Sequence, residues 1–385
     1  MRSFTFHAPS AVYFGQGVAS ALPDGVAALL GPRILIVIDA TIHSLGLADP
    51  FIASLHAAGS AVSLFDGVSP EPPDSNVEIA VGMARDMSAT GVVGIGGGSA
   101  MDVAKVVALV AGSRQPLDQL YGVNVATGPR LPLALAPTTA GTGSEATPVA
   151  ILVAGNAKKG VVSHHLLPDV AILDPELTVG LPPAVTAATG VDAMVHAIEA
   201  YTSASPNRNP VSQGLAQQAL RLLGANIRRV VDDGYDRDAR GAMLLGSFLA
   251  GQAFANSPVA AVHALAYPIG SRFHVAHGIS TALMLPHVMR FNLPNAASDY
   301  ASIAADIFPD LAETPLHERA DAMIRAVAEL ISAIGLPTSL QALAIPEQSL
   351  PDMAAEAMQQ TRLLINNPRP VTPEQALRIY QGAYR

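Results

Sequence analysis

The chain has 385 residues, of which 50% are hydrophobic, and its formal net charge is −9. This length exceeds what one core usually organises and favours two domains, while the acidic balance argues against nucleic acid as a partner, which would need clustered Lys and Arg. Cysteine is absent, which excludes disulfides, thiolate metal ligands and cysteine nucleophiles, so any metal must be bound by His, Asp or Glu.

No membrane or export segment is predicted. His, Pro and Gly interrupt the first seventeen residues too early for the apolar run of a signal peptide, so we expect a cytoplasmic protein. The longest charge-free run, residues 246–271, is long enough to span a bilayer. Four residues interrupt it, namely Gln252, Asn256, Pro258 and His263. We interpret this run as a buried helix and expect no contact with a membrane.

The first half of the chain alternates short apolar runs, rich in β-branched residues, with helical patterns. The apolar runs occupy residues 34–39, 61–67, 91–98, 131–139 and 170–174. Strands that are buried on both faces have this pattern, because they carry no polar face. We therefore predict a parallel sheet flanked by helices, an α/β fold.

Asp39 ends the first of these runs. A carboxylate at the end of such a strand can accept hydrogen bonds from both hydroxyls of an adenosine ribose, and it would repel a 2′-phosphate. This favours NAD over NADP. The alternative is a solvated residue in a strand-end turn. Asp39 precedes the glycine-rich turn described next, whereas the acidic residue of the usual dinucleotide fingerprint follows that turn.

A glycine-rich turn follows the apolar run at 91–98 and leads into a helix that begins near Ser99. The glycines at 94, 96, 97 and 98 allow backbone amides to approach a pyrophosphate, and the helix N-terminus adds a favourable partial charge. The turn therefore predicts a phosphate cradle. The alternative is a plain tight turn in which Ser99 and Asp102 form a capping box.

A loop rich in hydroxyl groups, with the sequence PTTAGTGSE, follows the run at 131–139. Its hydroxyls and amides can hold phosphates and the nicotinamide end of a cofactor, although such a loop alone is often only a polar turn. Together the three segments predict an NAD site. The residues expected to form it are Asp39, Gly96, Gly97, Gly98, Ser99, Asp102, Thr138, Thr139 and Thr142.

From Pro182 onward the pattern changes to long helical periods, as in residues 212–231 and 318–335. We therefore predict an all-helical second domain. No linker, charge run or repeat marks the junction, so the boundary is placed where the periodicity changes. The prediction is an NAD-binding domain over residues 1–181 and a helical metal-binding and substrate domain over residues 182–385.

The second half also carries a candidate metal site. Asp192 and His196 are four residues apart on a predicted helix, so both side chains leave one face. His263 projects from an otherwise apolar helix, and His277 follows fourteen residues later. A single His in an apolar helix is more often a hydrogen-bonded core residue, but four such ligands at two places favour one metal site, suited to divalent iron or zinc.

These motifs resemble those of the iron-containing (group III) alcohol dehydrogenases over nearly the full length. The strings that carry the resemblance include GGGSAMDVAK, PTTAGTGSE, LPDVAILDPELT, ATGVDAMVHAIEAYTS, HALAYPIG and NNPRPVT. The resemblance implies a fold like that of dehydroquinate synthase, with an α/β dinucleotide-binding domain and a helical C-terminal domain. It also implies Fe2+ at the four ligands, with Zn2+ as the alternative, Lys158 or else Lys159 near the nucleotide, and a homodimer or larger oligomer.

One position departs from the family pattern. Many members carry a further histidine four residues after the third ligand, where it relays the proton of the alcohol, and this chain has Tyr267 there. Tyr267 can still bind a ribose or substrate hydroxyl, and we expect His274 to relay the proton through water. The alternatives are an aromatic filler and a surface-loop histidine.

The resemblance implies transfer of a hydride between a primary or small alcohol, or its aldehyde, and NAD, with the metal activating the substrate oxygen. One alternative is a hydroxyacid-oxoacid transhydrogenase, whose carboxylate substrate would need a base such as Arg272. Another is maleylacetate reductase, which is disfavoured because that branch looks metal-independent. A protein that binds NAD without catalysis would be expected to have lost its metal ligands, and here they are intact.

Overall fold

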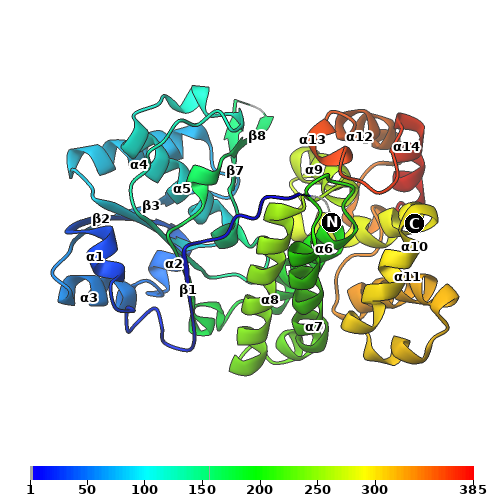
Figure 1. The fold of residues 1–385 in the computed structure, drawn as a ribbon. Helices are drawn as coiled ribbons and strands as arrows, with labels where there is room; N and C mark the ends of the chain where they lie inside the picture. Colours follow the sequence, from blue (N-terminus) through cyan, green and yellow to red (C-terminus); the bar gives the residue numbers. More distant parts are fainter. Residues whose placement is uncertain (1–2, 156) are drawn as a thin grey trace. The chain divides into compact units, whose positions relative to one another are not determined.

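The computed structural model describes residues 3–155 and 157–385. Its contacts divide this chain into two compact units (Figure 1). One unit comprises residues 7–179, and the other comprises residues 180–385 together with the described residues before His7. The assignment of NAD binding to residues 1–181 and of metal and substrate binding to residues 182–385 stays a prediction.

A six-stranded parallel sheet forms the centre of the 7–179 unit. Its strands lie in the order β1 (Ala11–Phe14), β9 (Val170–Leu173), β6 (Leu133–Pro137), β4 (Gly91–Gly96), β2 (Arg33–Asp39) and β3 (Ala61–Val68). Five of these strands coincide with the apolar runs of the sequence, and every residue of β4 and β6 is buried. The predicted parallel sheet is therefore confirmed, and the added edge strand β1 is only partly buried.

Helices cover both faces of this sheet (Figure 1). They are α1 (Val26–Leu30), α2 (Ala40–Ser44), α3 (Asp49–Ala57), α4 (Asp74–Asp86) and α5 (Gly98–Ser113). Along β2, Ile34 and Ile36 join one core with residues of α1 and α3, whereas Leu35 and Val37 join a second core with α4 and α5. Alternate side chains of a strand point to opposite faces, which is why β2 is apolar throughout.

A second, three-stranded sheet was not expected from the sequence. Its order is β5 (Gly122–Val123), β8 (Ala157–Val162) and β7 (Val149–Ala154), and β7 and β8 pair as an antiparallel hairpin. Single helical turns occupy η1 (Leu117–Gln119), η2 (Ser144–Ala146), η3 (His164–Leu166) and η4 (Pro175–Thr178). The hairpin follows the hydroxyl-rich loop directly, so it helps to position that loop.

In the 180–385 unit, all secondary-structure elements of the described residues are helices, as predicted. Its α-helices are α6 (Pro183–Thr202), α7 (Pro210–Asp232), α8 (Arg237–Asn256), α9 (Ala261–Phe273), α10 (His277–Ile307), α11 (Leu316–Ala333), α12 (Leu350–Ala357), α13 (Thr361–Leu364) and α14 (Pro373–Gly382). The short turns η5 (Pro309–Glu313), η6 (Gln341–Leu343) and η7 (Glu347–Ser349) lie between them. Helices α6, α7 and α8 pack on one another, and α10 packs against α6, α7, α9 and α11.

The charge-free run at 246–271 forms two helices, so the prediction of a single buried helix was wrong. Helix α8 ends at Asn256 and α9 begins at Ala261. The break contains Pro258, which lacks a backbone N–H and disfavours helical geometry at Ser257 before it. Among the described residues, no helix combines the length and apolarity needed to cross a bilayer.

Candidate functional site

Three of the four predicted metal ligands meet in a buried cluster. Asp192 and His196 leave the same face of α6, and His263 lies in the first turn of α9. One ligand atom from each of the three residues lies within 4.8 Å of the others. All three side chains are buried, and the rings of His196 and His263 stack with centroids 4.7 Å apart. The cluster therefore presents two nitrogens and one carboxylate to one point.

His277, the fourth predicted ligand, is the first residue of α10 and lies beside this cluster. Its Nε2 is 3.7 Å from Asp192 Oδ1, and its ring centroid is 5.4 Å from that of His263. The His277 side chain is 37% exposed, so it stands at the rim. All four predicted ligands thus come together from three helices.

A carboxylate that sequence reasoning missed orients His263. Glu199, buried on α6, lies with Oε2 at 2.6 Å from His263 Nδ1, and its Oε1 accepts a hydrogen bond from Val262 N at 2.7 Å. A carboxylate on Nδ1 holds the proton there and leaves the Nε2 lone pair available, the arrangement common behind metal-binding imidazoles. Glu199 lies seven residues, two turns, after Asp192, and that spacing was the signal in the sequence.

The electrostatics of the cluster favour a cation. Burial raises the pKa of Asp192, but the imidazoles of His196, His277 and His263 and a hydrogen bond from Thr281 lower it further than burial raises it. Burial lowers the pKa of His263, whereas Glu199 and Asp192 raise it by more. The same negative field that favours a proton on His263 favours a metal cation in its place.

The donor set fits a divalent transition metal. His263 Nε2 is buried and has no hydrogen-bond partner among the described residues. An unpaired buried nitrogen is costly, and coordination would satisfy it. Imidazole nitrogens with one carboxylate suit iron or zinc.

The structure treats the two candidate proton carriers differently. Tyr267 lies one turn after His263 on α9, half-buried, with its ring centroid 6.0 Å from that of His277. His274 is the exposed residue that ends α9, in a left-handed conformation with φ of 55°. In the described chain, no hydrogen bond or ring contact joins the His274 side chain to the four ligand candidates.

The glycine-rich turn opens α5 as the sequence predicts. Gly97 is the N-cap of α5, the helix begins at Gly98, and no side chain caps it in the described chain. The alternative capping box of Ser99 and Asp102 is therefore wrong, because the Asp102 carboxylate instead accepts hydrogen bonds from Ser144 Oγ at 2.7 Å and Ile151 N at 2.9 Å. The first amides of α5 remain available for a phosphate.

Close approaches show that the three predicted NAD-binding segments meet. A Cβ atom placed on Gly98 would lie 2.9 Å from Thr142 Cγ2, and one on Gly97 would lie 3.7 Å from Thr139 Oγ1. A Cβ on Gly96 would lie 3.4 Å from Asp39 Oδ2. The absent side chains therefore allow the turn to approach the hydroxyl-rich loop and the end of β2 closely.

Asp39 also has a local structural role in the turn at the end of β2, which was the alternative interpretation of this residue. Its Oδ1 accepts hydrogen bonds from Thr41 N and Ile42 N, both at 3.0 Å, and so caps α2. Its Oδ2 is the atom that faces Gly96. One oxygen therefore fixes the side chain, and the other is directed to the glycine-rich turn.

Lys105 and Asp102 tie the hydroxyl-rich loop to α5, a pair that sequence reasoning did not recognise. The fully buried ammonium of Lys105 donates to Ser144 Oγ at 2.7 Å, Thr147 Oγ1 at 3.1 Å and the Val149 carbonyl at 2.8 Å. Burial lowers the pKa of Lys105 to about 8, against the pull of Asp102. This pair holds the loop in place, and Thr138 at its start keeps a buried hydroxyl without a partner in the described chain.

Lys158 lies on β8, where its ammonium pairs with Glu71 Oε1 at 2.6 Å. The alternative, Lys159, lies over the Tyr121 ring at 5.4 Å. Neither lysine has a hydrogen bond or ion pair with the glycine-rich turn in the described chain.

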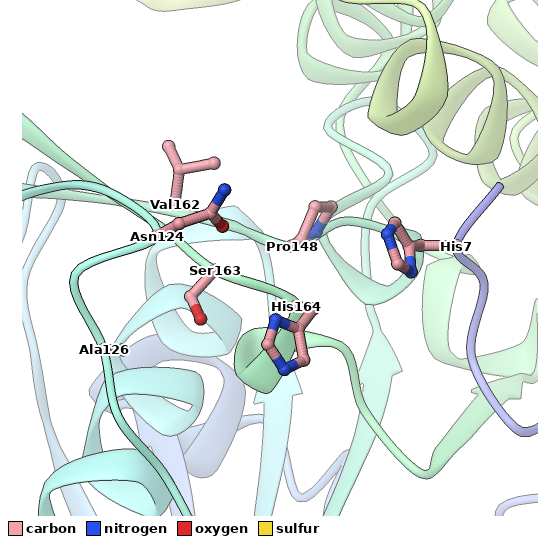
Figure 2. A pocket seen from close by; sticks show the side chains of 7 residues that line it. All are labelled: His7, Asn124, Ala126, Pro148, Val162, Ser163 and His164. Carbon is pink, nitrogen blue, oxygen red and sulfur yellow. The ribbon is translucent and has the colours of Figure 1, made fainter. Parts of the chain in front are cut away.

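A pocket of about 420 Å³ in the 7–179 unit lies elsewhere. Figure 2 shows His7, which comes from the N-terminal segment, on one side of the pocket, and Ser163 and His164, which directly follow β8, nearby. Asn124 and Val162 complete one wall. No residue predicted from the sequence to bind cofactor lines this pocket, so the predicted contacts do not depend on it.

Comparison with known proteins identifies the family. The family model described as iron-containing alcohol dehydrogenase matches residues 9–175, and the model of the C-terminal part of that family matches residues 186–384. A long-chain-alcohol dehydrogenase of Geobacillus thermodenitrificans is 41% identical over 98% of this chain and 95% of its own length. The crystal structure of a 1,3-propanediol oxidoreductase has a TM-score of 0.95 at 35% identity and covers 100% of both chains.

A sulfoacetaldehyde reductase from Bifidobacterium kashiwanohense, solved in complex with NAD+, has a TM-score of 0.87 at 29% identity over 100% of this chain and 99% of its own. The chain matches these proteins across both of its units. It therefore belongs to the iron-containing alcohol dehydrogenase family and is an alcohol oxidoreductase.

Proposed function

We propose that this oxidoreductase transfers a hydride between a primary or small alcohol, or its aldehyde, and NAD, at a site that holds one divalent metal. The observation that carries the proposal is the buried cluster of Asp192, His196 and His263, in which His263 Nε2 has no partner among the described residues. Fe2+ is the proposed ion because the family is iron-containing, and Zn2+ suits the same donors. A bound metal supplies Lewis-acid polarisation of the substrate oxygen.

The residues around the cluster have separate roles in this proposal. Asp192, His196, His263 and His277 supply the ligand atoms, and Glu199 holds His263 in the orientation that directs Nε2 inward. Thr281 donates to Asp192 Oδ1 at 2.8 Å and so fixes the carboxylate. Two of the ligands, His263 and Asp192, are therefore held in place by hydrogen bonds of their own.

NAD is the proposed hydride acceptor. Asp39 Oδ2 beside Gly96 is suited to the ribose hydroxyls, and the uncapped N-terminus of α5 is suited to the pyrophosphate. Thr139 and Thr142 adjoin the same glycines. The NAD+ complex of the related sulfoacetaldehyde reductase also supports this choice.

Oxidation of an alcohol releases one hydride from carbon and one proton from oxygen, and the proton needs a carrier. The position of Tyr267 beside His277 supports Tyr267 as the group that hydrogen-bonds the substrate hydroxyl. His274 is exposed at the end of α9, so it is placed to exchange protons with water. A cytoplasmic location and a homodimer or larger assembly stay predictions.

The transhydrogenase alternative is not favoured by the structure. A carboxylate substrate would need a basic partner, and the Arg272 guanidinium already pairs with Glu356 at 2.7 Å and with Asp352 at 3.4 Å. The buried cluster of Asp192, His196 and His263 likewise disfavours a metal-independent reductase.

Elemental analysis of the purified protein, combined with NAD-linked oxidation of a panel of alcohols, tests the proposal. We expect about one divalent metal per chain, which His263→Ala should lose together with activity. His317→Ala is the matched control, since His317 is 80% exposed on α11 and should keep both. Full metal occupancy in His263→Ala would remove His263 from the ligand set, and a metal-free active protein would overturn the proposal.

A further inference from the structure

A second pocket of about 290 Å³, in the 180–385 unit, is lined by basic side chains from separate segments. Helix α10 contributes His287 and Arg290, the segment between α13 and α14 contributes Arg369, and α14 contributes Arg378. Phe291 and Ile379 add apolar walls. Among the described residues, no acidic side chain and none of the proposed metal ligands lines the pocket.

The charge of this pocket is only partly balanced. Arg290 pairs with Asp321 of α11. Among residues 3–155 and 157–385, no carboxylate lies within ion-pair distance of Arg369 or Arg378. Two guanidinium groups thus have no direct ion-pair partner in the described chain, although Glu374 on α14 interacts electrostatically with Arg378 and the whole chain carries a net charge of −9. A local excess of positive charge in an acidic protein attracts an anion from solution.

One donor in the pocket, the Arg369 guanidinium, is held in position. Arg369 donates through one terminal nitrogen to the Phe291 carbonyl at 2.8 Å, and its guanidinium lies 4.2 Å from the centroid of the Phe291 ring. An arginine has five N–H donors in a rigid fork, so most of them remain for a ligand. Gln375 and Arg378 are three residues apart on α14 and share one face.

We propose that this pocket is a binding site for a small organic anion that carries carboxylate or phosphate groups. Both groups match the planar fork of arginine, and three guanidinium groups around one cavity favour an anion with more than one charged oxygen. Phe291 and Ile379 can cover a short hydrocarbon body between those groups. None of the proposed metal ligands is among the described residues that line this pocket.

Isothermal titration calorimetry of the full-length, metal-loaded protein tests this site with two probes, inorganic phosphate and succinate, at low ionic strength. Saturating NAD is included so that the phosphate cradle of the 7–179 unit does not bind the probe. We expect one binding event per chain with at least one probe. Arg369→Gln and Arg378→Gln should each raise its Kd at least about tenfold, because each removes charge-assisted hydrogen bonds.

The control is Arg228→Gln, an exposed arginine on α7 that does not line the pocket, and its Kd should equal that of the unaltered protein. Arg369→Gln also loses the contact with Phe291, so the exposed Arg378 keeps the test decisive if that variant does not fold. Binding of succinate alone would identify a carboxylate ligand, and binding of phosphate alone a phosphate ester. No binding of either probe, or an unchanged Kd in a folded Arg378→Gln variant, would overturn the proposal.

Discussion

Glu145 is a carboxylic acid whose two oxygens are buried without hydrogen-bond partners in the described chain. It lies in the single turn η2, next to Ser144. Burial raises the pKa of Glu145 from its ordinary value of 4.5 to about 7, with its own amide and Lys105 opposing the shift. The folded protein therefore holds this proton more tightly than the unfolded chain does.

We predict that Glu145→Gln removes part of the pH dependence of stability. A raised pKa in the folded state contributes stability below pH 4.5 that is lost as pH rises through about 7. A shift of this size corresponds to about 3 kcal/mol. Denaturant unfolding at about pH 5 and about pH 7.5 should show most of this loss in the unaltered protein and not in the Glu145→Gln variant. The pKa of Lys105 is about 8, above this window, so Lys105 contributes little to the change in stability. An equal pH dependence of stability in both proteins would contradict the prediction.

Asp39 is expected to set the preference for NAD over NADP. Its Oδ2 faces the glycine-rich turn, where it would repel a 2′-phosphate. Asp39→Gly should bring the kcat/KM values for NAD and NADP closer together. The variant should also be less stable, because Asp39 Oδ1 caps α2. Steady-state kinetics with both cofactors measures the two kcat/KM values. Equal efficiency in the unaltered protein would show that Asp39 does not distinguish the ribose.

The roles of Tyr267 and His274 in proton transfer can be distinguished by substituting each residue. Tyr267 lies next to His277, whereas His274 is exposed at the end of α9. The loss of a general acid or base typically costs ~10²–10⁴-fold in rate. We expect Tyr267→Phe to lower kcat by at least the smaller of these factors and His274→Ala to have a weaker effect. The reverse order, measured across pH, would make His274 the relay that the sequence alone suggests.

At the scale of helices, Gly278 determines how closely α10 approaches α6. A Cβ atom at this position would lie 2.5 Å from the Ala188 carbonyl oxygen and 2.8 Å from its carbon. Neither is a flexible side-chain atom, so the backbone would have to move. His277, the adjacent residue, would move with it, since both are in the first turn of α10.

We therefore predict that Gly278→Ala weakens metal binding about 10–100-fold, as loss of a supporting contact typically does, with the helix content unchanged. Competition with a chelator measures the affinity, and circular dichroism measures the helix content. Gly214→Ala on α7 is the control, because a Cβ there meets no atom within 4 Å. Equal affinities in the two variants would show that His277 does not depend on this close approach.

The elements that the sequence predicted are those with strong periodicity. The strands β2, β4 and β6 are continuous apolar runs, and α7 and α11 have long helical periods. The hairpin β7–β8 was missed because β8 contains two lysines and a glycine, which interrupt its apolar pattern, and because it pairs with β7 only in the fold. The break between α8 and α9 was missed because the run is apolar on both sides of Pro258, and a single proline was not taken as the end of a helix.

Across the whole molecule, residues whose spacing in the sequence indicates their chemistry were predicted, whereas residues that meet only in the folded structure were not. The spacing of Asp192 and His196 on one helix face is visible in the sequence, as is the glycine-rich turn. The partner of His263 was not predicted, because Glu199 is 64 residues away in the chain and pairs with it only after α6 and α9 pack. Lys105 was missed for the same reason, since its three acceptors lie on a loop distant in sequence.

The distribution of the four proposed ligands over α6, α9 and α10 makes the metal a reporter of tertiary structure. Each helix keeps its own backbone hydrogen bonds if it separates from the others, so far-ultraviolet spectra would barely register the separation. The ion, in contrast, would lose ligands as soon as one helix moved. The rate at which metal is released to a coloured chelator would therefore report the rate at which α6, α9 and α10 separate, before any loss of secondary structure.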